Sequence, residues 1–289
     1  MSGSYIAIDW GSTHLRAWLY ADGQCIDSLQ LPYGVSRLVE HTAREVFDKY
    51  IEPWRKRQAT PVVMAGMIGS EAGWQPVPYL PCPVSLHELS ARLFEVAENV
   101  WIVPGLKVEG DGRFNVMRGE ETQLLGAMQL ASAASFVLPG THSKWVRVAN
   151  GTVSEFATAM TGELHHLLMN SSLIGKGLPG QREDGAAFDA GLESGLQTPS
   201  LVSRLFEARA ARVLGALPPE SVGEWLSGLL IGAEVAALRG KETQVTLVGS
   251  QSLCGRYRQA LALAGIQASE LAGDAAFQQG IRSILDARR

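Results

Sequence analysis

One arrangement occurs twice in this chain: three short apolar runs joined by tight turns. The runs cover residues 5–8, 15–20 and 25–31 in the first copy and residues 135–138, 144–148 and 153–158 in the second. Short apolar runs with tight connections predict a three-stranded antiparallel meander, and Asn150-Gly151 is a residue pair typical of a hairpin turn. The chain has 289 residues, which is enough for two domains of ordinary size.

Further elements are expected between and after the two meanders. The patterns predict strands at residues 61–64, 100–103 and 244–248, and helices at residues 42–57, 90–99, 120–130, 162–173, 200–239 and 275–287. The strand at 244–248 is expected to be the last one. Thr161 is the expected N-cap of the helix at 162–173. A Gly/Pro-rich segment at 175–185 separates that helix from the helical region at 200–239.

Composition excludes several classes of protein. A net charge of −4, with 46% hydrophobic and 19% charged residues and no basic stripe, does not indicate a nucleic-acid surface. The three cysteines lie far apart without a CxxC pair, which predicts neither a disulfide framework nor a zinc site. Neither a secretory signal nor an apolar run of about 18 residues is evident. We therefore expect a soluble, cytoplasmic protein that binds no membrane.

The turn after the first run, residues 9–13, has the composition of a phosphate site. Gly11 lets the backbone approach a ligand closely, Ser12 and Thr13 add hydroxyl donors, and successive turn amides can bind an anion. The carboxylate of Asp9 is suited to Mg²⁺, which prefers one or two carboxylates together with phosphate oxygens. The alternative is a hairpin turn that uses glycine and serine only for its geometry.

Residues 140–144 occupy the equivalent place in the second meander. Gly140 and Thr141 repeat the glycine and hydroxyl pattern, and His142 and Lys144 add donor groups. Two such turns facing each other across a cleft could hold a triphosphate between them, and the pair is more informative than either turn alone. The alternative for His142 and Lys144 is a solvated position on a strand.

Three other groups of residues could take part in chemistry. Glu120 and Glu121 open a helix, where a carboxylate could accept a proton from an attacking hydroxyl, although acidic residues are common in a first turn. Gly249-Ser250 follows a strand and could leave room for adenine, or could be an ordinary turn. His165-His166 is an adjacent pair that points about 100° apart on a helix, which favours a structural or substrate-edge role over a metal site.

The ordered set of these segments resembles the sugar kinase, heat-shock 70 and actin superfamily. The segments IAIDWGSTHLRAWL and FVLPGTHSKWVRV are similar to its two phosphate motifs, VTLVGSQSLCGRYRQAL to its adenosine motif, and VMRGEETQLLGA and AGDAAFQQGIRSI to its two connecting helices. The segments PVVMAGMIGS, YLPCP, TGELHHLL and LSGLLIGAE extend the resemblance to one family, the 2-dehydro-3-deoxygalactonokinases.

The resemblance implies an α/β fold with two actin-like (ribonuclease H-like) domains, each a five-stranded mixed sheet flanked by helices, and an ATP cleft between them. The implied domains are residues 1–118, completed by the helix at 275–289, and residues 119–274. The implied activity is ATP-dependent phosphorylation of 2-dehydro-3-deoxy-D-galactonate at its 6-hydroxyl, with Mg²⁺ as cofactor. A homodimer is also expected.

The same resemblance suggests where the substrate lies. The loop with Gly66 and Met67 is expected against the sugar acid, and Arg16 and Arg118 are candidates to bind its carboxylate, because a guanidinium can do so bidentately. The Gly-acid step of superfamily sugar kinases favours Glu120 as the base, whereas the acid-acid-x-x-Leu pattern of superfamily phosphatases favours Glu121. The rival functions are a kinase for another small sugar and a non-catalytic ATP-binding module.

Overall fold

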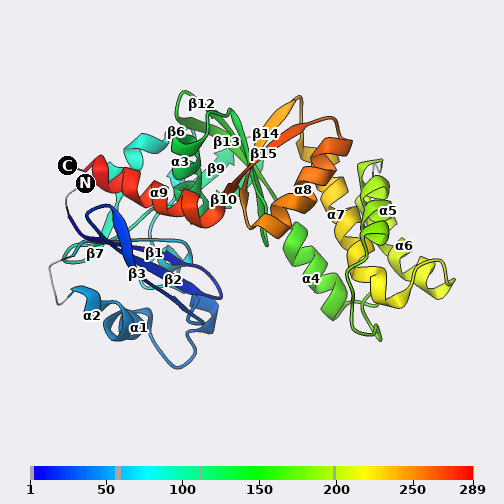
Figure 1. Cartoon of the computed structure of the whole chain (residues 1–289), viewed down its shortest axis with the longest axis horizontal. Coiled ribbons are helices and arrows are strands. Elements are labelled where there is room, and N and C mark those ends of the chain that lie inside the picture. Colours follow the sequence, from blue (N-terminus) through cyan, green and yellow to red (C-terminus); the bar gives the residue numbers. More distant parts are fainter. Residues whose placement is uncertain (1–2, 56–59, 111, 198–199, 289) are drawn as a thin grey trace. The chain divides into compact units, whose positions relative to one another are not determined.

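The computed structural model describes residues 3–55, 60–110, 112–197 and 200–288, and the chain divides into two compact units (Figure 1). Unit 1 comprises Met1–Ser132, Arg147–Phe156 and Gly273–Arg289, and unit 2 comprises Ala133–Val146 and Ala157–Ala272. The first unit therefore continues beyond residue 118, because the helix that begins at Glu120 packs within it. The functional division at 1–118 and 119–274 stays a prediction.

Unit 1 is built on a six-stranded sheet with the order β3-β2-β1-β4-β8-β7. Its strands are β1 (Tyr5–Trp10), β2 (Leu15–Ala21), β3 (Gln24–Leu31), β4 (Val62–Ala65), β7 (Phe94–Ala97) and β8 (Val100–Ile102). The first three form the predicted antiparallel meander, and β4 and β8 extend it in parallel. The turn from β2 to β3 has positive φ at Asp22 and Gly23, as a two-residue hairpin turn requires.

Helices cover both faces of this sheet (Figure 1). They are α1 (Ala43–Tyr50) and α2 (Glu52–Arg55) on one face and α9 (Gly273–Asp286) on the other, and α3 (Glu120–Leu130) packs on α9. Ala17 of β2 belongs to the core cluster that contains Phe47 of α1. The next residue, Trp18, packs instead on Phe277 of α9, with ring centroids 5.8 Å apart. This is the alternation of a strand that is buried on both faces.

The helix expected at residues 42–57 is in fact two helices, α1 and α2, which meet at Ile51. Pro53 accounts for the break, because it has no N–H to donate and its ring clashes with the carbonyl group four residues earlier. A capping box formed by Thr42 and Glu45 fixes the start of α1. Residues 56 and 57 lie outside the described part of the chain.

The prediction of a helix at residues 90–99 is wrong. The 3-10 helix η3 (Leu86–Arg92) occupies its first part, and β7 its second. β7 pairs antiparallel with β8, and Asn99 turns the chain between them with a φ of 58°. Asparagine tolerates this left-handed conformation, so Asn99 was the available signal for a hairpin.

A small second sheet in unit 1 had no counterpart among the expected elements. It has the order β10-β9-β5, with β5 (Leu80–Pro81), β9 (Leu106–Gly110) and β10 (Arg113–Met117). Most side chains of the β9–β10 hairpin are partly or fully exposed, so no apolar run marks it in the sequence. The hairpin matters for the site because β10 ends at Met117, directly before Arg118 and Gly119.

The third sheet repeats the first. Its order is β15-β14-β11-β12-β13-β6, with β6 (Val84–Ser85), β11 (Ser135–Leu138), β12 (Ser143–Ala149), β13 (Thr152–Ala159), β14 (Gln244–Gly249) and β15 (Gln267–Ala272). The order β13-β12-β11-β14-β15 matches β3-β2-β1-β4-β8, which confirms the duplication, and each sheet carries one additional edge strand. Asn150 and Gly151 both have positive φ, which confirms the predicted hairpin turn.

The strand at 244–248 is not the last one, because β15 follows it and pairs with it in parallel. β15 escaped prediction since its sequence, QASELA, is polar and partly exposed, as an edge strand can be. The remaining helices are α4 (Thr161–Ser171), α5 (Gly185–Leu196), α6 (Leu201–Val213), α7 (Val222–Leu238) and α8 (Gln251–Leu263). The region expected to be helical at 200–239 is thus two helices, which are separated by the 3-10 turn η4 (Pro219–Ser221).

Helix α5 was missed because glycine and alanine dominate its sequence. Those glycines allow a close approach to α7: a Cβ atom at Gly191 would lie 2.0 Å from the carbonyl oxygen of Trp225, and one at Gly195 would lie 2.3 Å from that of Leu229. Residues Pro219–Leu238 are long and apolar enough to cross a membrane by length and composition alone. Since 61% of that stretch is buried inside the protein, a core helix accounts for the same composition.

Candidate active site

In unit 1 the candidate residues gather where two neighbouring strands end. β1 and β4 are parallel, with Asp9 opposite Ala65, so the segments that follow them meet at one edge of the sheet. A Cβ atom at Gly66 would lie 2.7 Å from the carbonyl oxygen of Trp10 and 3.5 Å from Oδ1 of Asp9. A Cβ atom at Gly119, just before α3, would lie 3.2 Å from the Cα of Gly66. Three segments far apart in the sequence therefore converge here.

The turn after β1 is supported from behind by backbone contacts. The N–H of Val35 donates to the carbonyl of Gly11 at 3.0 Å. A Cβ atom at Gly34 would lie 2.2 Å from the carbonyl carbon of Thr13, so only glycine permits this approach. Ser12, within this turn, is exposed. A pocket of about 240 Å³ lies on the turn, lined by Asp9, Gly11, Thr13, His14, Arg16 and Gln30.

Arg16 is ion-paired with two carboxylates, those of Asp9 and Asp274. Asp274 lies in the first turn of α9, 258 positions further along the chain, and it was not among the residues expected at the site. Its place at the start of a helix in the AGDAAFQQG segment was the available signal. Burial raises the pKa of Asp9, and the Arg16 guanidinium opposes that rise by favouring the ionised carboxylate.

The two acidic candidates at the start of α3 lie in different environments. Glu121 is fully buried and accepts hydrogen bonds from the backbone N–H of Gly119 at 2.7 Å and from the hydroxyl of Thr122 at 3.0 Å. Burial raises the pKa of Glu121 to about 8, and the charge of Glu120 adds to the rise. Glu120 is partly exposed and accepts from the backbone N–H of Arg118 at 3.0 Å. Of the two carboxyl groups, that of Glu120 is the accessible one.

Arg118 is a buried cation whose hydrogen bonding is incomplete. Its Nη2 donates to the carbonyl of Val77 at 2.6 Å, and its guanidinium lies 4.2 Å from the ring centre of Tyr79. Within the described part of the chain, no acceptor reaches its buried Nε and Nη1 atoms. Arg118 lines a pocket of about 620 Å³ together with Met67 and Gly69. Because an unpaired buried charge is costly, this guanidinium is suited to an anionic ligand.

Unit 2 repeats the convergence of strand ends. β11 and β14 are parallel, with Val137 opposite Leu247, so the segments after them lie at the same edge. A Cβ atom at Gly249 would lie 3.6 Å from the carbonyl oxygen of Pro139. The turn that begins at Gly140 and the Gly249-Ser250 step are therefore neighbours in this unit.

The turn at residues 140–144 is attached to helix α4. The backbone N–H of Glu163 donates to the carbonyl of Thr141 at 3.0 Å, and the carboxylate of Glu163 pairs with the ring of His142. Lys144 is buried, not solvated, and its ammonium group lies 3.5 Å from the carbonyl of His142. Thr141 and His142 are exposed.

The expected role of Thr161 as an N-cap is wrong. Met160 holds the N-cap position of α4 without a side-chain capping bond. Thr161 is the first residue of the helix, and its hydroxyl donates to the carboxylate of Glu234 on α7. The threonine thus ties the start of α4 to another helix.

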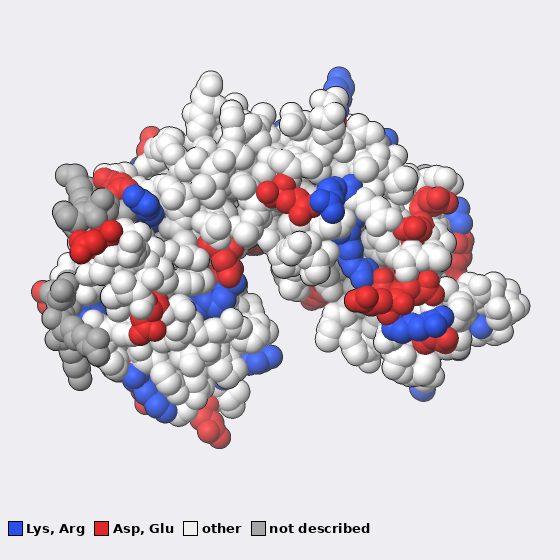
Figure 2. All heavy atoms as spheres, viewed as in Figure 1, with Lys and Arg blue, Asp and Glu red and all other residues white. Residues whose placement is uncertain are grey.

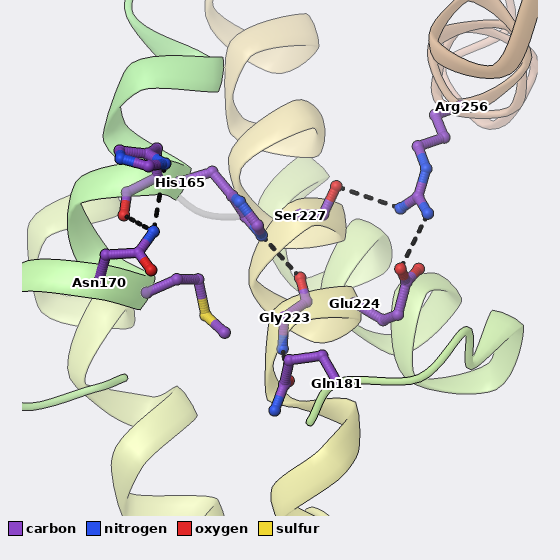
Figure 3. Close-up of a pocket in the computed structure, with 9 residues that line it drawn as sticks. His165, Asn170, Gln181, Gly223, Glu224, Ser227 and Arg256 are labelled. Carbon is purple, nitrogen blue, oxygen red and sulfur yellow. Dashed lines mark hydrogen bonds and ion pairs between the residues drawn. The ribbon is translucent and has the colours of Figure 1, made fainter. Parts of the chain in front are cut away.

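Figure 3 shows a pocket of about 450 Å³ among α4, α7 and α8. His165 contacts a backbone carbonyl of α7 at 2.9 Å, and His166 contacts Asn170 at 3.1 Å, so the two rings have different partners. Arg256 of α8 donates to Glu224 of α7 at 2.9 Å. The lining residues are His165, His166, Met169, Asn170, Gln181, Gly223, Glu224, Ser227 and Arg256. Of these residues, only the two histidines were expected to contribute to a site.

Charge on the molecular surface is mixed. On the face shown in Figure 2, basic and acidic side chains are interspersed and form no long basic stripe. Across the described residues, no group of three or more His, Cys, Asp or Glu side chains could hold a metal ion. A metal in the site of unit 1 would therefore depend on one or two carboxylates together with oxygens of a ligand.

Comparison with known proteins places the chain in a family. The 2-keto-3-deoxy-galactonokinase family matches residues 9–284. A 2-dehydro-3-deoxygalactonokinase of Escherichia coli (strain K12) is 52% identical over 290 residues, which are 99% of each chain.

Solved structures extend the likeness to the fold. A candidate 2-dehydro-3-deoxygalactonokinase from Sinorhizobium meliloti has a TM-score of 0.88 and 31% identity, with 98% of each chain covered. The activator of 2-hydroxyisocaproyl-CoA dehydratase from Clostridium difficile, solved with ADPNP, has a TM-score of 0.55 at 12% identity, covering 99% of this chain and 96% of that one. This second likeness shows the fold alone, which is the two-domain actin-like fold that was expected. On the family match and the E. coli relative together, the chain belongs to the 2-keto-3-deoxy-galactonokinase family.

Proposed function

We propose that this chain transfers the γ-phosphoryl group of ATP to the 6-hydroxyl of 2-dehydro-3-deoxy-D-galactonate, a step of galactonate breakdown. Membership of the family supports the reaction. The observation in the structure that carries the proposal is the guanidinium of Arg118, a buried cation with two nitrogens that lack acceptors among the described residues. A kinase for a sugar acid needs a cation of this kind for the substrate carboxylate.

Arg118 is the better of the two arginine candidates for the carboxylate. Arg16 already pairs with Asp9 and Asp274, so a substrate carboxylate would have to compete with two protein carboxylates. Arg118 lies over Tyr79 and lines the same pocket as Met67. Protein atoms cover its Nε and Nη1, so binding would include a turn of the guanidinium toward the pocket.

The nucleotide is assigned to elements of both units. We place the phosphates at the turns Gly11-Ser12-Thr13 and Gly140-Thr141, with Lys144 contributing charge. Adenine is placed beside Gly249-Ser250, the step that leads into α8. The same helix forms one wall of the pocket in Figure 3, through Arg256. The structural relative from Clostridium difficile was solved with ADPNP, which fits nucleotide binding on this fold.

Asp9 fits the requirements of a Mg²⁺ ligand. It lines the pocket on the first turn, and Arg16 favours its ionised form. Mg²⁺ bound there would neutralise charge on the phosphates. The single carboxylate matches the preference of this ion for one or two protein carboxylates plus phosphate oxygens.

Glu120 is the proposed base. The 6-hydroxyl oxygen attacks the γ-phosphorus, its proton passes to the Glu120 carboxylate, and the bond to the β-phosphate oxygen breaks to release ADP. Glu120 is accessible, and it follows Gly119, which packs on Gly66 beside the carboxylate of Asp9. Glu121 is buried and is assigned to holding the start of α3.

Two further properties belong to the proposal. The protein is cytoplasmic, in keeping with its three free cysteines and the substrate assigned to it. It forms a homodimer, for which α6 offers exposed apolar side chains at Val202 and Phe206. Light scattering on the wild type and on Phe206→Asp would test the dimer, since a loss of dimer is expected only in the variant.

The function is tested by ATP consumption with 2-dehydro-3-deoxy-D-galactonate as acceptor and its gluconate epimer as control. We expect turnover that requires the acceptor and prefers the galactonate epimer. Preferential turnover of another sugar would make the chain a different kinase of the superfamily. Nucleotide binding without turnover of any acceptor would make it a non-catalytic module.

A further inference from the structure

A buried carboxylate in unit 2 takes no part in the proposed chemistry. Glu234 lies in α7 and is 5% exposed. Its Oε1 accepts from the indole N–H of Trp145 at 2.7 Å. Its Oε2 accepts from the hydroxyl of Tyr257 at 2.7 Å and from that of Thr161. A carboxylate with this many donors is kept in place by several elements at once, which are β12, α4 and α8.

One branch of this network reaches the end of the second phosphate turn. Tyr257 donates to Glu234, so its oxygen is left to accept from the hydroxyl of Ser143, which lies 2.7 Å away. Ser143 is the first residue of β12 and is fully buried. Trp145, two residues on, lies on the same face of the strand and bonds the carboxylate directly.

The other branch reaches the same turn from its opposite side. Thr161 ties the start of α4 to Glu234. The next residues touch the turn: a Cβ atom at Gly162 would lie 2.6 Å from the carbonyl oxygen of Gly140, and the N–H of Glu163 donates to the carbonyl of Thr141. The start of β12 and the start of α4, which both contact the turn, are thus both connected to the carboxylate of Glu234 by hydrogen bonds.

We propose that Glu234 is a positioning residue for phosphoryl transfer, which holds the turn at residues 140–143 in the shape that binds the nucleotide phosphates. It acts through Tyr257 and Ser143 on one side and through Thr161 on the other, and it touches no substrate. The inference rests on the proposed function in one respect, because it takes this turn to be a phosphate-binding element.

Hydrogen-bond directions identify the variants that test this. In Glu234→Gln the amide oxygen must accept from Trp145, whose indole can only donate. The amide nitrogen then faces Tyr257 and Thr161, and Tyr257 must turn its proton toward Ser143. This variant keeps every position occupied and should fold. Tyr257→Phe and Ser143→Ala cut the branch to the turn and leave the carboxylate in place.

Ser269→Ala is the matched control. The Ser269 hydroxyl bonds that of Thr246 at 2.9 Å, between β15 and β14 of unit 2. Among the described residues, no side-chain hydrogen bond joins this pair to residues 140–143. Each purified variant is compared with the wild type by steady-state kinetics. Calorimetry then measures its affinity for the ATP analogue AMP-PNP and for AMP, which lacks the β- and γ-phosphates.

We expect Tyr257→Phe and Ser143→Ala to lower kcat roughly tenfold, because small misplacements of binding groups are costly. We also expect weaker AMP-PNP binding with unchanged AMP binding, the same pattern in a milder form for Glu234→Gln, and wild-type values for Ser269→Ala. Equal losses for AMP and AMP-PNP, or no loss for either, would overturn the positioning role. This comparison decides the point even if no sugar acid is phosphorylated, which would refute the proposed function separately.

Discussion

The two six-stranded sheets share a strand order, and each has a candidate phosphate turn at the same place, yet the two turns are supported differently. In unit 1 the turn after β1 packs against the backbone at Gly34. Asp9 and Arg16, which line the pocket on this turn, form an ion pair. In unit 2 the turn after β11 is backed by a buried network of neutral donors around Glu234.

This difference indicates that the two copies of the meander have different roles, one in chemistry and one in positioning the nucleotide. Unit 1 places charged groups at its pockets: Asp9 and Arg16 line one pocket and Arg118 lines another. Unit 2 buries its central carboxylate and uses it to hold backbone in place. Substitutions in unit 1 should therefore change the chemistry with small effects on folding. Substitutions around Glu234 should change nucleotide positioning.

The largest effect is expected for Asp9→Asn in unit 1. Loss of the carboxylate removes the proposed magnesium ligand, and kcat should fall roughly a thousandfold, because a metal contributes several kcal/mol of charge stabilisation. Arg16 keeps its pair with Asp274, so the thermal midpoint should change little. Near-normal turnover in a folded variant would remove Asp9 from the metal site.

Glu120→Gln and Glu121→Gln separate the accessible carboxyl group from the buried one. Glu120→Gln should lower kcat about a hundredfold, the range for a general base. Glu121→Gln should lower it far less, since Glu121 is fully buried. Parallel measurements of kcat on both proteins decide between them, and the reverse ranking would assign the base to Glu121.

Arg118→Met tests recognition of the substrate carboxylate. The KM for the sugar acid should rise roughly tenfold or more, because hydrogen bonds between charged groups are worth about 1.5–3 kcal/mol. The KM for ATP should stay the same. Arg113→Met is the control, since Arg113 is an exposed arginine of the preceding strand that pairs with Glu155. Equal changes in the two variants would contradict the assignment.

The last prediction concerns the pH dependence of stability and not turnover. Burial raises the pKa of Glu121 from 4.5 to about 8. Between pH 4.5 and about 8, Glu121 therefore keeps its proton in the folded protein and loses it in the unfolded chain. Stability should therefore fall as pH rises from about 4.5 to about 8, by at most about 1.4 kcal/mol per pH unit. Urea unfolding across this range gives the free energy of unfolding at each pH. For Glu121→Gln this free energy should fall less steeply with pH than for the wild type, and an identical pH dependence would contradict the raised pKa.

Local signals predicted the elements that form the framework of both sites. The Asn150-Gly151 pair marked the hairpin of the second meander, and the structure has positive φ at both residues. The equivalent turn of the first meander, Asp22-Gly23, has the same conformation. Helix α3 was predicted at its observed bounds. Other segments were missed or wrongly predicted. No apolar run marks β7, the β9–β10 hairpin or β15. Helix α5 depends on close glycine packing, which only the tertiary structure reveals.

The candidate site was predictable only in part for the same reason. Asp9, Gly66 and Glu120 were selected from short motifs, and the structure brings their segments together. The pairing of Arg16 with Asp274 spans 258 positions and has no local signature. The unequal burial of Glu120 and Glu121 likewise follows from how α3 packs, so the sequence could not separate them.

The roles assigned to the two turns depend on the proposal that one nucleotide binds at both of them. Its most direct test is a crystal structure of the wild-type chain with Mg²⁺ and AMP-PNP. We expect phosphate oxygens within hydrogen-bond distance of the backbone at Gly11–Thr13 and also at Gly140–Thr141. A triphosphate that contacts only one of the two turns, or neither, would contradict it.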